Sequence, residues 1–196
     1  ENKHVSFSNF IYSNFRFPLI YLFNSSKFSI SNVYFSSQIY FDGINSEFNF
    51  SNVTYTKSTK SVSSAFHFSS CIVNFLNFNM NNIITSIHET DGFIELSNSS
   101  LKIKKSNFVN LTAHNGSLIS SNNNSSLKLK DCLFEHGIYF HLICSLGNSL
   151  NSVRNCTFNH NYGHIYYSID TKEELFEKTV FKNNIHPFST LFAFNN

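Results

Sequence analysis

The chain has 196 residues, 41% of them hydrophobic and 17% aromatic, which is enough apolar material for the core of an ordinary domain. Only 13% of the residues are charged and the net charge is +2, which argues against a protein that binds nucleic acid through a broad basic surface. No run of about 18 apolar residues occurs, so we expect no membrane-spanning helix in this stretch.

A short pattern recurs eight times, and each copy ends on an aromatic anchor residue. Counting back from the anchor by two, five and seven positions reaches mostly apolar residues, as in Phe28, Ile30, Val33 and Phe35. The anchors lie 20 to 30 residues apart, and they are Phe10, Phe35, Tyr55, Phe78, Phe108, Phe134, Phe158 and Phe181. Period-two strands repeated at this distance predict a solenoid, in which the anchors stack as an aromatic ladder inside the molecule.

Each repeat divides into three short strands. Apolar segments at 22–23, 65–68, 93–96, 142–144 and 165–167 predict the first strand of successive coils, and polar turns rich in Asn and Ser follow several of them. The second strand ends at a sharp corner three residues before the anchor, where Asn32, Asn52, Asp131 and Asn155 tolerate a left-handed backbone. Residues 171–174 also fit a helix capping box, but Phe176, Thr179 and Phe181 keep the strand register, so we favour a strand there.

These features predict an all-β fold. We expect a right-handed parallel β-helix solenoid of about eight coils of 20–30 residues, with three short strands per coil, as a single domain over residues 1–196. The chain starts at Glu1 within a repeat and stops at Asn196 after a strand, so we expect a fragment of a longer protein.

The three-strand coil, the Asn corner and the Phe column resemble the right-handed parallel β-helix of the pectin-lyase-like superfamily. Within it, the chain is similar to Asn-rich adhesin-like surface proteins with polymorphic-outer-membrane-type repeats, found in microbes and protists. The resemblance covers roughly residues 3–196, and it implies the fold more specifically than any activity.

The cysteines and lysines are placed by the same register. Cys132 and Cys156 both lie two residues before an anchor, so we expect them to stack inward one coil apart. That spacing is within disulfide range, but parallel neighbours align their Cβ atoms side by side, so a disulfide and two free thiols remain alternatives.

The densest basic group should lie on the solvated outer face, and it comprises Lys102, Lys104, Lys105, Lys128 and Lys130.

Four histidines form two pairs at equivalent positions of adjacent coils. His136 and His160 follow their anchors by two residues, while His141 and His164 precede a first strand. We expect the four to converge, with Glu135 and Asn161 as the nearest supporting acceptors. They are candidate ligands for a metal ion or for a pH-sensitive patch. The alternative, which we favour, is that no metal or other cofactor is bound and that this surface makes polar contacts with a partner.

Catalytic residues are hard to find in the pattern. The resemblance implies that lyases and hydrolases of the superfamily use clustered Asp with Arg, Lys or His on the first-strand face. Here the 12 acidic residues are scattered, and the nearest group is His88, Glu89 and Asp91. We therefore expect no catalysis in this stretch. The alternative is a carbohydrate-active lyase or hydrolase whose catalytic coils lie partly outside it.

Asn-x-Ser/Thr glycosylation motifs are numerous, and those in open turns or loops are the better acceptor candidates: Asn24, Asn98, Asn115 and Asn124. We therefore expect a secreted or cell-surface, non-enzymatic structural and adhesive solenoid. Its partners would be neighbouring chains, further coils of the parent protein, or carbohydrate. A third possibility is an intracellular scaffold component with free thiols and unoccupied motifs.

Overall fold

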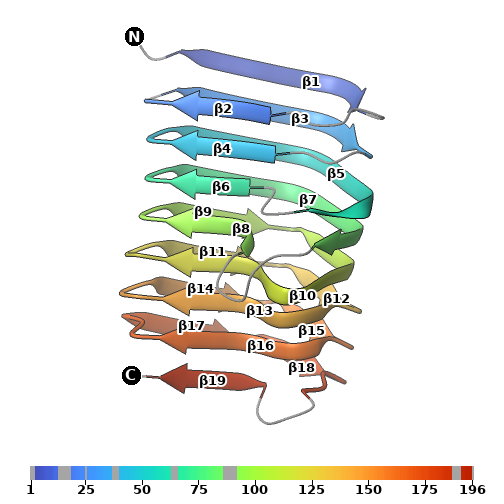
Figure 1. Ribbon diagram of the computed structural model, residues 1–196, viewed down its shortest axis with the longest axis vertical. Coiled ribbons are helices and arrows are strands. Elements are labelled where there is room, and N and C mark those ends of the chain that lie inside the picture. Colours follow the sequence, from blue (N-terminus) through green and yellow to red (C-terminus); the bar gives the residue numbers. More distant parts are fainter. Residues whose placement is uncertain are drawn as a thin grey trace.

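A computed structural model shows a stack of parallel strands that rises along the long axis of the molecule, with the two ends of the chain at opposite ends of the stack (Figure 1). The structure describes residues 3–12, 19–24, 26–36, 40–62, 66–85, 92–186 and 191–195. Within these ranges the regular elements are all strands, so the predicted all-β parallel solenoid is confirmed. The described residues contain no helix long and apolar enough to cross a membrane.

The strands follow one another in the order of the predicted coils. Their bounds are β1 His4–Tyr12, β2 Leu19–Phe23, β3 Lys27–Phe35, β4 Tyr40–Ile44, β5 Glu47–Val62, β6 Phe66–Ser69, β7 Ile72–Thr85, β8 Gly92–Ser97, β9 Ser100–Lys104, β10 Asn107–Asn122, β11 Ser126–Lys130, β12 Leu133–Glu135, β13 Ile138–Leu146, β14 Leu150–Arg154, β15 Thr157–Asn159, β16 Tyr162–Ile169, β17 Glu173–Glu177, β18 Val180–Lys182 and β19 Phe192–Asn195.

One side of the solenoid is the parallel stack β1, β3, β5, β7, β9, β11, β14 and β17, in which each strand pairs with the next. The molecule has about six turns, slightly fewer than the eight coils expected. Three separate strands per coil occur near the C-terminus, as in β14, β15 and β16. In earlier coils β5, β7 and β10 continue around a corner as single strands.

The predicted Asn corner is confirmed. Asn32, Asn52, Asp131 and Asn155 all have a left-handed backbone, with φ between 51° and 57°. The same corner is occupied by Asn9 and Asn77, and also by Lys105 and Lys178, which the residue-type argument did not anticipate. Left-handed backbone is unfavourable for most side chains, and Asn lowers that cost because its amide can hydrogen-bond locally.

The interior ladder agrees with the predicted column at six anchors and differs at two. Phe35 pairs with Tyr55, and the run Phe108, Phe134, Phe158 and Phe181 is continuous. In that run Phe134 stacks on Phe108 and Phe158 with ring centroids 4.7 and 4.9 Å apart.

The assignments of Phe10 and Phe78 as anchors are wrong by two residues. Phe10 pairs with Val33 and Phe78 with Val53, both two positions before an anchor. The anchor positions belong to Tyr12 and Met80, because Tyr12 pairs with Phe35 and Met80 pairs with Tyr55 and Phe108. Both positions face inward, so a Phe fits either one and the aromatic residue alone does not define the register.

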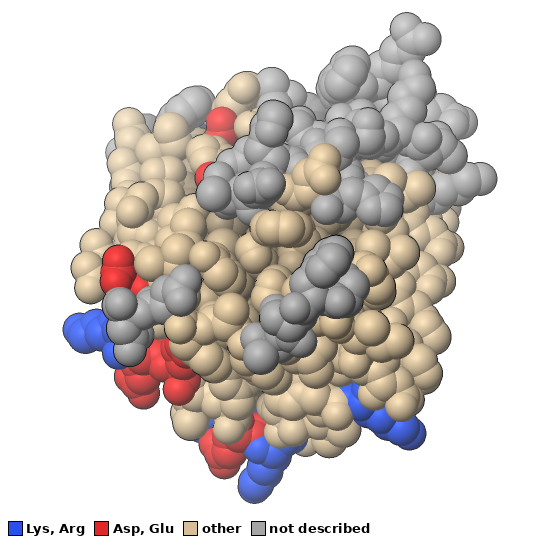
Figure 2. Space-filling model, turned by 60° about the horizontal axis from the view of Figure 1, so that its bottom comes forward, with Lys and Arg blue, Asp and Glu red and all other residues tan. Residues whose placement is uncertain are grey.

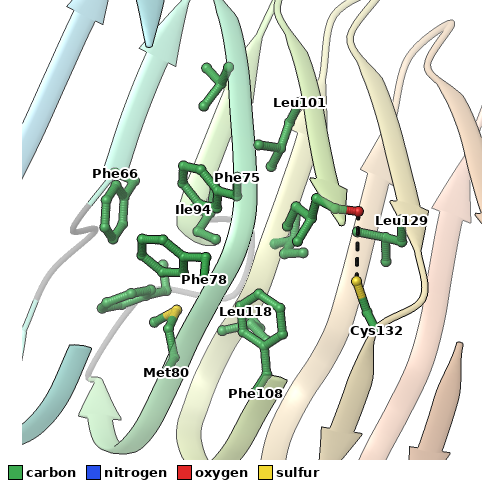
Figure 3. Close-up of a cluster of buried hydrophobic side chains, with 14 of the residues drawn as sticks. Phe66, Phe75, Phe78, Met80, Ile94, Leu101, Phe108, Leu118, Leu129 and Cys132 are labelled. Atoms are coloured by element: carbon green, nitrogen blue, oxygen red, sulfur yellow. Dashed lines mark hydrogen bonds between the residues drawn. The ribbon is translucent and has the colours of Figure 1, made fainter. Parts of the chain in front are cut away.

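Apolar side chains from all sides of the solenoid meet in this interior. Figure 3 shows Phe66, Phe75, Phe78, Met80 and Phe108 pointing into the same enclosed space from neighbouring coils. Stacked and edge-to-face ring contacts are both frequent there, for example Phe75 on Phe78 at 4.4 Å and Phe50 against Phe75 at 4.9 Å. The burial of these rings is the main stabilising contribution in this part of the chain.

Near the C-terminus the interior also holds a polar cluster. Asn151 continues the column of Leu127, and its amide Nδ2 donates to Ser145 Oγ at 2.6 Å and to Tyr166 Oη at 2.8 Å. The Tyr166 hydroxyl in turn donates to Glu174 Oε1 at 3.1 Å. Glu174 lies in β17, so the strand favoured over a capped helix for residues 171–174 and beyond is confirmed from Glu173 onward.

Candidate functional sites on the outer faces

His136 and His160 lie at the corner that follows β12 and β15, and both have left-handed backbone with φ of 54° and 51°. Their rings stack with centroids 5.0 Å apart and planes 18° apart. Glu135, the last residue of β12, has Oε1 3.9 Å from His136 Nε2. One ligand atom from each of these three side chains lies within 4.8 Å of the others.

His141 and His164 form a second group in the paired strands β13 and β16. Their ring centroids are 5.2 Å apart, and His164 lies 3.9 Å from the ring of His186. The His141 ring is 5% exposed and stacks on Tyr167 at 4.4 Å. Burial, with smaller contributions from His164 and His186, lowers the pKa of His141 to about 4.

The expectation that all four histidines converge is therefore wrong. In the part of the chain that the structure describes, the one group with three mutually close ligand atoms is Glu135, His136 and His160. The extended start of β13 separates His136 from His141, because a strand advances about 3.3 Å per residue. Asn161, also expected beside the histidines, is buried and bonds to Phe134 O and to the Gly137 amide instead.

Cys132 and Cys156 stack inward as predicted, and both are buried free thiols, as are Cys71 and Cys144. The Cys132 Sγ donates to Lys130 O at 3.2 Å and approaches Ile103 O at 3.6 Å, the contact drawn in Figure 3. Hydrogen bonding with Cys156, together with burial, raises the pKa of the Cys132 thiol well above its usual range. All four cysteines are buried, as expected for residues that contribute to packing.

A column of ionisable side chains that sequence reasoning missed runs along the outer face of the first strands. Asp42, His67 and Glu95 are aligned in β4, β6 and β8, with His67 Nδ1 3.3 Å from Asp42 Oδ1. Beside them, burial, Asp42, Tyr21 and Glu95 raise the pKa of the Tyr40 hydroxyl. The signal was available, because each residue follows an inward Phe or Ile of the first strand by one position. The group His88, Glu89 and Asp91 lies outside the described residues.

The basic residues lie on the solvated outer face, as predicted. Lys102 pairs with Lys128, and Lys104 pairs with Lys130, which pairs with Arg154. All are exposed, and Arg154 Nε lies 3.3 Å from Glu177 Oε2. Elsewhere charge is sparse: most of the face in Figure 2 is uncharged, and its charged side chains of both signs lie near the margin.

The glycosylation candidates Asn24, Asn98, Asn115 and Asn124 are all exposed. Three of them, Asn24, Asn98 and Asn124, have left-handed backbone at the turn between strands. The expectation that Asn115 lies in an open turn or loop is wrong, because Asn115 lies within β10 at a register shift in its pairing with β13. The amides of Asn52 and Asn155 at the tight corner donate to neighbouring coils, and Asn24 Oδ1 accepts from Asn45 Nδ2 at 3.4 Å. The four candidates are therefore accessible from solvent.

No family model, curated protein or solved structure matches the chain. Its relation to the pectin-lyase-like superfamily and to adhesin-like proteins therefore remains a prediction from the residue pattern.

Proposed function

We propose that the chain is a non-enzymatic structural and adhesive solenoid of a secreted or cell-surface protein, similar to the adhesin-like members of the pectin-lyase-like superfamily. The observation that carries this is the exposure of interior columns at both ends of the stack. Phe7 of β1 is 46% exposed and Phe194 of β19 is 53% exposed, although both belong to columns that are buried elsewhere.

The backbone at these ends supports the same proposal. Among the described residues β1 pairs with β3 alone and β19 with β16 alone, so each end presents a strand edge beside exposed apolar side chains. Exposed edges of this kind are templates for another strand. A neighbouring chain would continue the hydrogen-bond ladder and cover Phe7 or Phe194.

Sedimentation velocity over a range of concentrations tests this association. We expect the wild-type chain to associate reversibly and the Phe7→Lys variant to associate more weakly, because the charge would be buried on contact. Ser8→Lys is the matched control, since Ser8 is an exposed neighbour on the same strand. A chain that stays monomeric at high concentration, or equal weakening by both variants, would contradict the proposal.

The adhesive part of the proposal concerns the side faces, which offer exposed Asn, Ser and Lys for polar contacts with protein or carbohydrate. Intact mass before and after enzymatic glycan removal tests the surface location. A mass loss supports occupied motifs at exposed residues such as Asn98. An unchanged mass for protein from a secreting eukaryotic host favours the intracellular scaffold alternative instead.

A carbohydrate-active enzyme is the second candidate, and the column of Asp42, His67 and Glu95 favours it. Two rungs of about 4.8 Å place Asp42 and Glu95 about 10 Å apart along the stack. Pairs of carboxyl groups in inverting glycosidases are about 6.5–9.5 Å apart, so the spacing is close to that range. Activity on a panel of acidic polysaccharides, lost in Asp42→Asn and Glu95→Gln but kept in Asp131→Asn, would establish it.

A further inference from the structure

Glu135, His136 and His160 differ from the other histidine groups because their ligand atoms are both close together and open to solvent. The three come from two adjacent rungs, at the end of β12 and at the corners after β12 and β15. His136 and His160 are exposed and Glu135 is partly buried. An ion could therefore reach them without any opening of the core.

The backbone holds the two imidazoles in register. The His136 amide donates to Asn159 O and the His160 amide donates to Lys182 O, each at 3.1 Å, so both corners are fixed by the ladder of the next coil. The parallel stacking of equivalent corners then places the two rings face to face. Two ligands at the same position of adjacent coils are thus provided by the repeat itself.

Glu135 is held by a neighbouring side chain. Asn159 Nδ2 donates to Glu135 Oε1 at 2.6 Å, and the register of β12 and β15 places Asn159 directly beside Glu135. Hydrogen bonds from outer groups to a ligating carboxylate orient it and strengthen metal binding. The sequence suggested Glu135 only as such a supporting group, whereas the structure places it among the ligands.

We propose that Glu135, His136 and His160 bind a divalent transition-metal ion, with Zn²⁺ the ion that this donor set fits best. Two imidazoles and one carboxylate are a common three-ligand set for zinc, and they leave a fourth position for water or for a group of a partner. Tetrahedral bonds of about 2.1 Å put ligand atoms roughly 3.4 Å apart. Rotation of the exposed His136 and His160 side chains would close the spread of up to 4.8 Å to that value.

A nearby positive charge lowers the affinity that we expect for a metal cation. Lys182 pairs with Asn159 one rung beyond the site and adds a positive charge near it. With three ligands on an exposed surface, we expect binding in the micromolar range. The site does not depend on the adhesive or enzymatic proposal, because its ligands lie outside the column of Asp42, His67 and Glu95.

Isothermal titration of the whole chain with ZnCl₂, and the visible absorption of added Co²⁺, test the proposal directly. We expect one ion per chain and a Co²⁺ spectrum of a four-coordinate site. His136→Asn and His160→Asn should each weaken binding at least about tenfold, and Asn159→Ala should weaken it about 10- to 100-fold. Glu135→Gln should also weaken binding, because it removes the carboxylate charge.

The chain itself indicates that the histidine variants will fold. Asn82, Asn110 and Asn183 occupy the same left-handed corner in other coils, so Asn is native to this position. His67→Asn is the matched control, since His67 also lies beside a carboxylate but pairs with Asp42 and Glu95 on the adjacent strands instead of with a second histidine. Absence of zinc binding by the wild-type chain overturns the proposal, and so does binding that survives in both corner variants or is lost equally in the control.

Discussion

Asn77 Nδ2 donates a hydrogen bond to Asn52 Oδ1 at 2.9 Å, and both residues have left-handed backbone with φ of 52°. The same contact joins Asn52 to Asn32 at 2.9 Å and Asn32 to Asn9 at 3.0 Å. One residue type therefore makes the corner and also connects successive corners along the outside. This combination explains why Asn is so abundant in a chain with only 6 Gly.

The two roles of Asn52 can be separated by substitution. Asn52→Ala removes both amide contacts and puts Ala in left-handed backbone, which together should cost roughly 2 kcal/mol of folding free energy. Asn52→Gly removes the same contacts but relaxes the backbone, so it should cost only about 1 kcal/mol. Urea denaturation of the two variants measures the difference, and equal losses would show that the corner conformation carries no cost.

A second prediction concerns the aromatic ladder. Phe134 is fully buried between Phe108 and Phe158, so Phe134→Ala should leave a cavity and cost about 3–5 kcal/mol. Lys128→Ala changes an exposed side chain of the preceding strand and should cost under about 0.5 kcal/mol. Thermal and urea unfolding test both variants, and similar losses in the two would refute the register.

The register was predictable wherever the spacing of the apolar residues and the position of the corner residue selected the same anchor. At Phe134 the apolar spacing and Asp131 at the corner select the same anchor, and the structure confirms it. At Phe78 the two signals disagree. The aromatic residue suggests Phe78 as the anchor, whereas the corner residue Asn77 lies three residues before Met80 and selects Met80. The corner residue was the better guide, because few residue types tolerate left-handed backbone whereas any large apolar residue fits either inward column.

The sites were less predictable because they depend on which coils lie side by side. Asn151 and Glu174 occupy positions that the pattern assigns to apolar residues, and only the approach of Tyr166 from another strand explains them. Asp42, His67 and Glu95 are far apart in the sequence and come together only through the register of β4, β6 and β8. Neither arrangement is visible until the length of each return segment is known.

The cysteines yield a third prediction. Because all four thiols are buried and burial raises the pKa of Cys144 to about 11, a thiol reagent near pH 8 should react slowly with the native chain. All four should react at once in denaturant under non-reducing conditions. Mass spectrometry after each treatment counts the modified thiols. Only two reactive thiols in denaturant would reveal a disulfide, with Cys132 and Cys156 as its expected members.

The last prediction is a pH dependence of stability that originates at His141. Burial, His164 and His186 lower its pKa to about 4 in the folded chain, whereas an unfolded histidine titrates near about 6.5. Between these two values the unfolded state binds more protons than the folded state. The contribution of His141 is therefore fully present above about pH 6.5, and it decreases as the pH falls toward about 4.

Urea unfolding at several pH values between about 4 and 7 measures this contribution. For one proton the folding free energy should fall by at most about 1.4 kcal/mol per pH unit within that window. His141→Gln removes the titrating ring while His164, His186 and Tyr167 stay in place, so the variant should show a smaller slope than the wild-type chain. His4→Gln, at an exposed position of β1, should leave the slope unchanged. The His141 ring is the only titrating group that His141→Gln removes. Equal slopes in the wild-type chain and this variant would therefore contradict the prediction and show that another group, such as His164 or a carboxylate, controls acid stability.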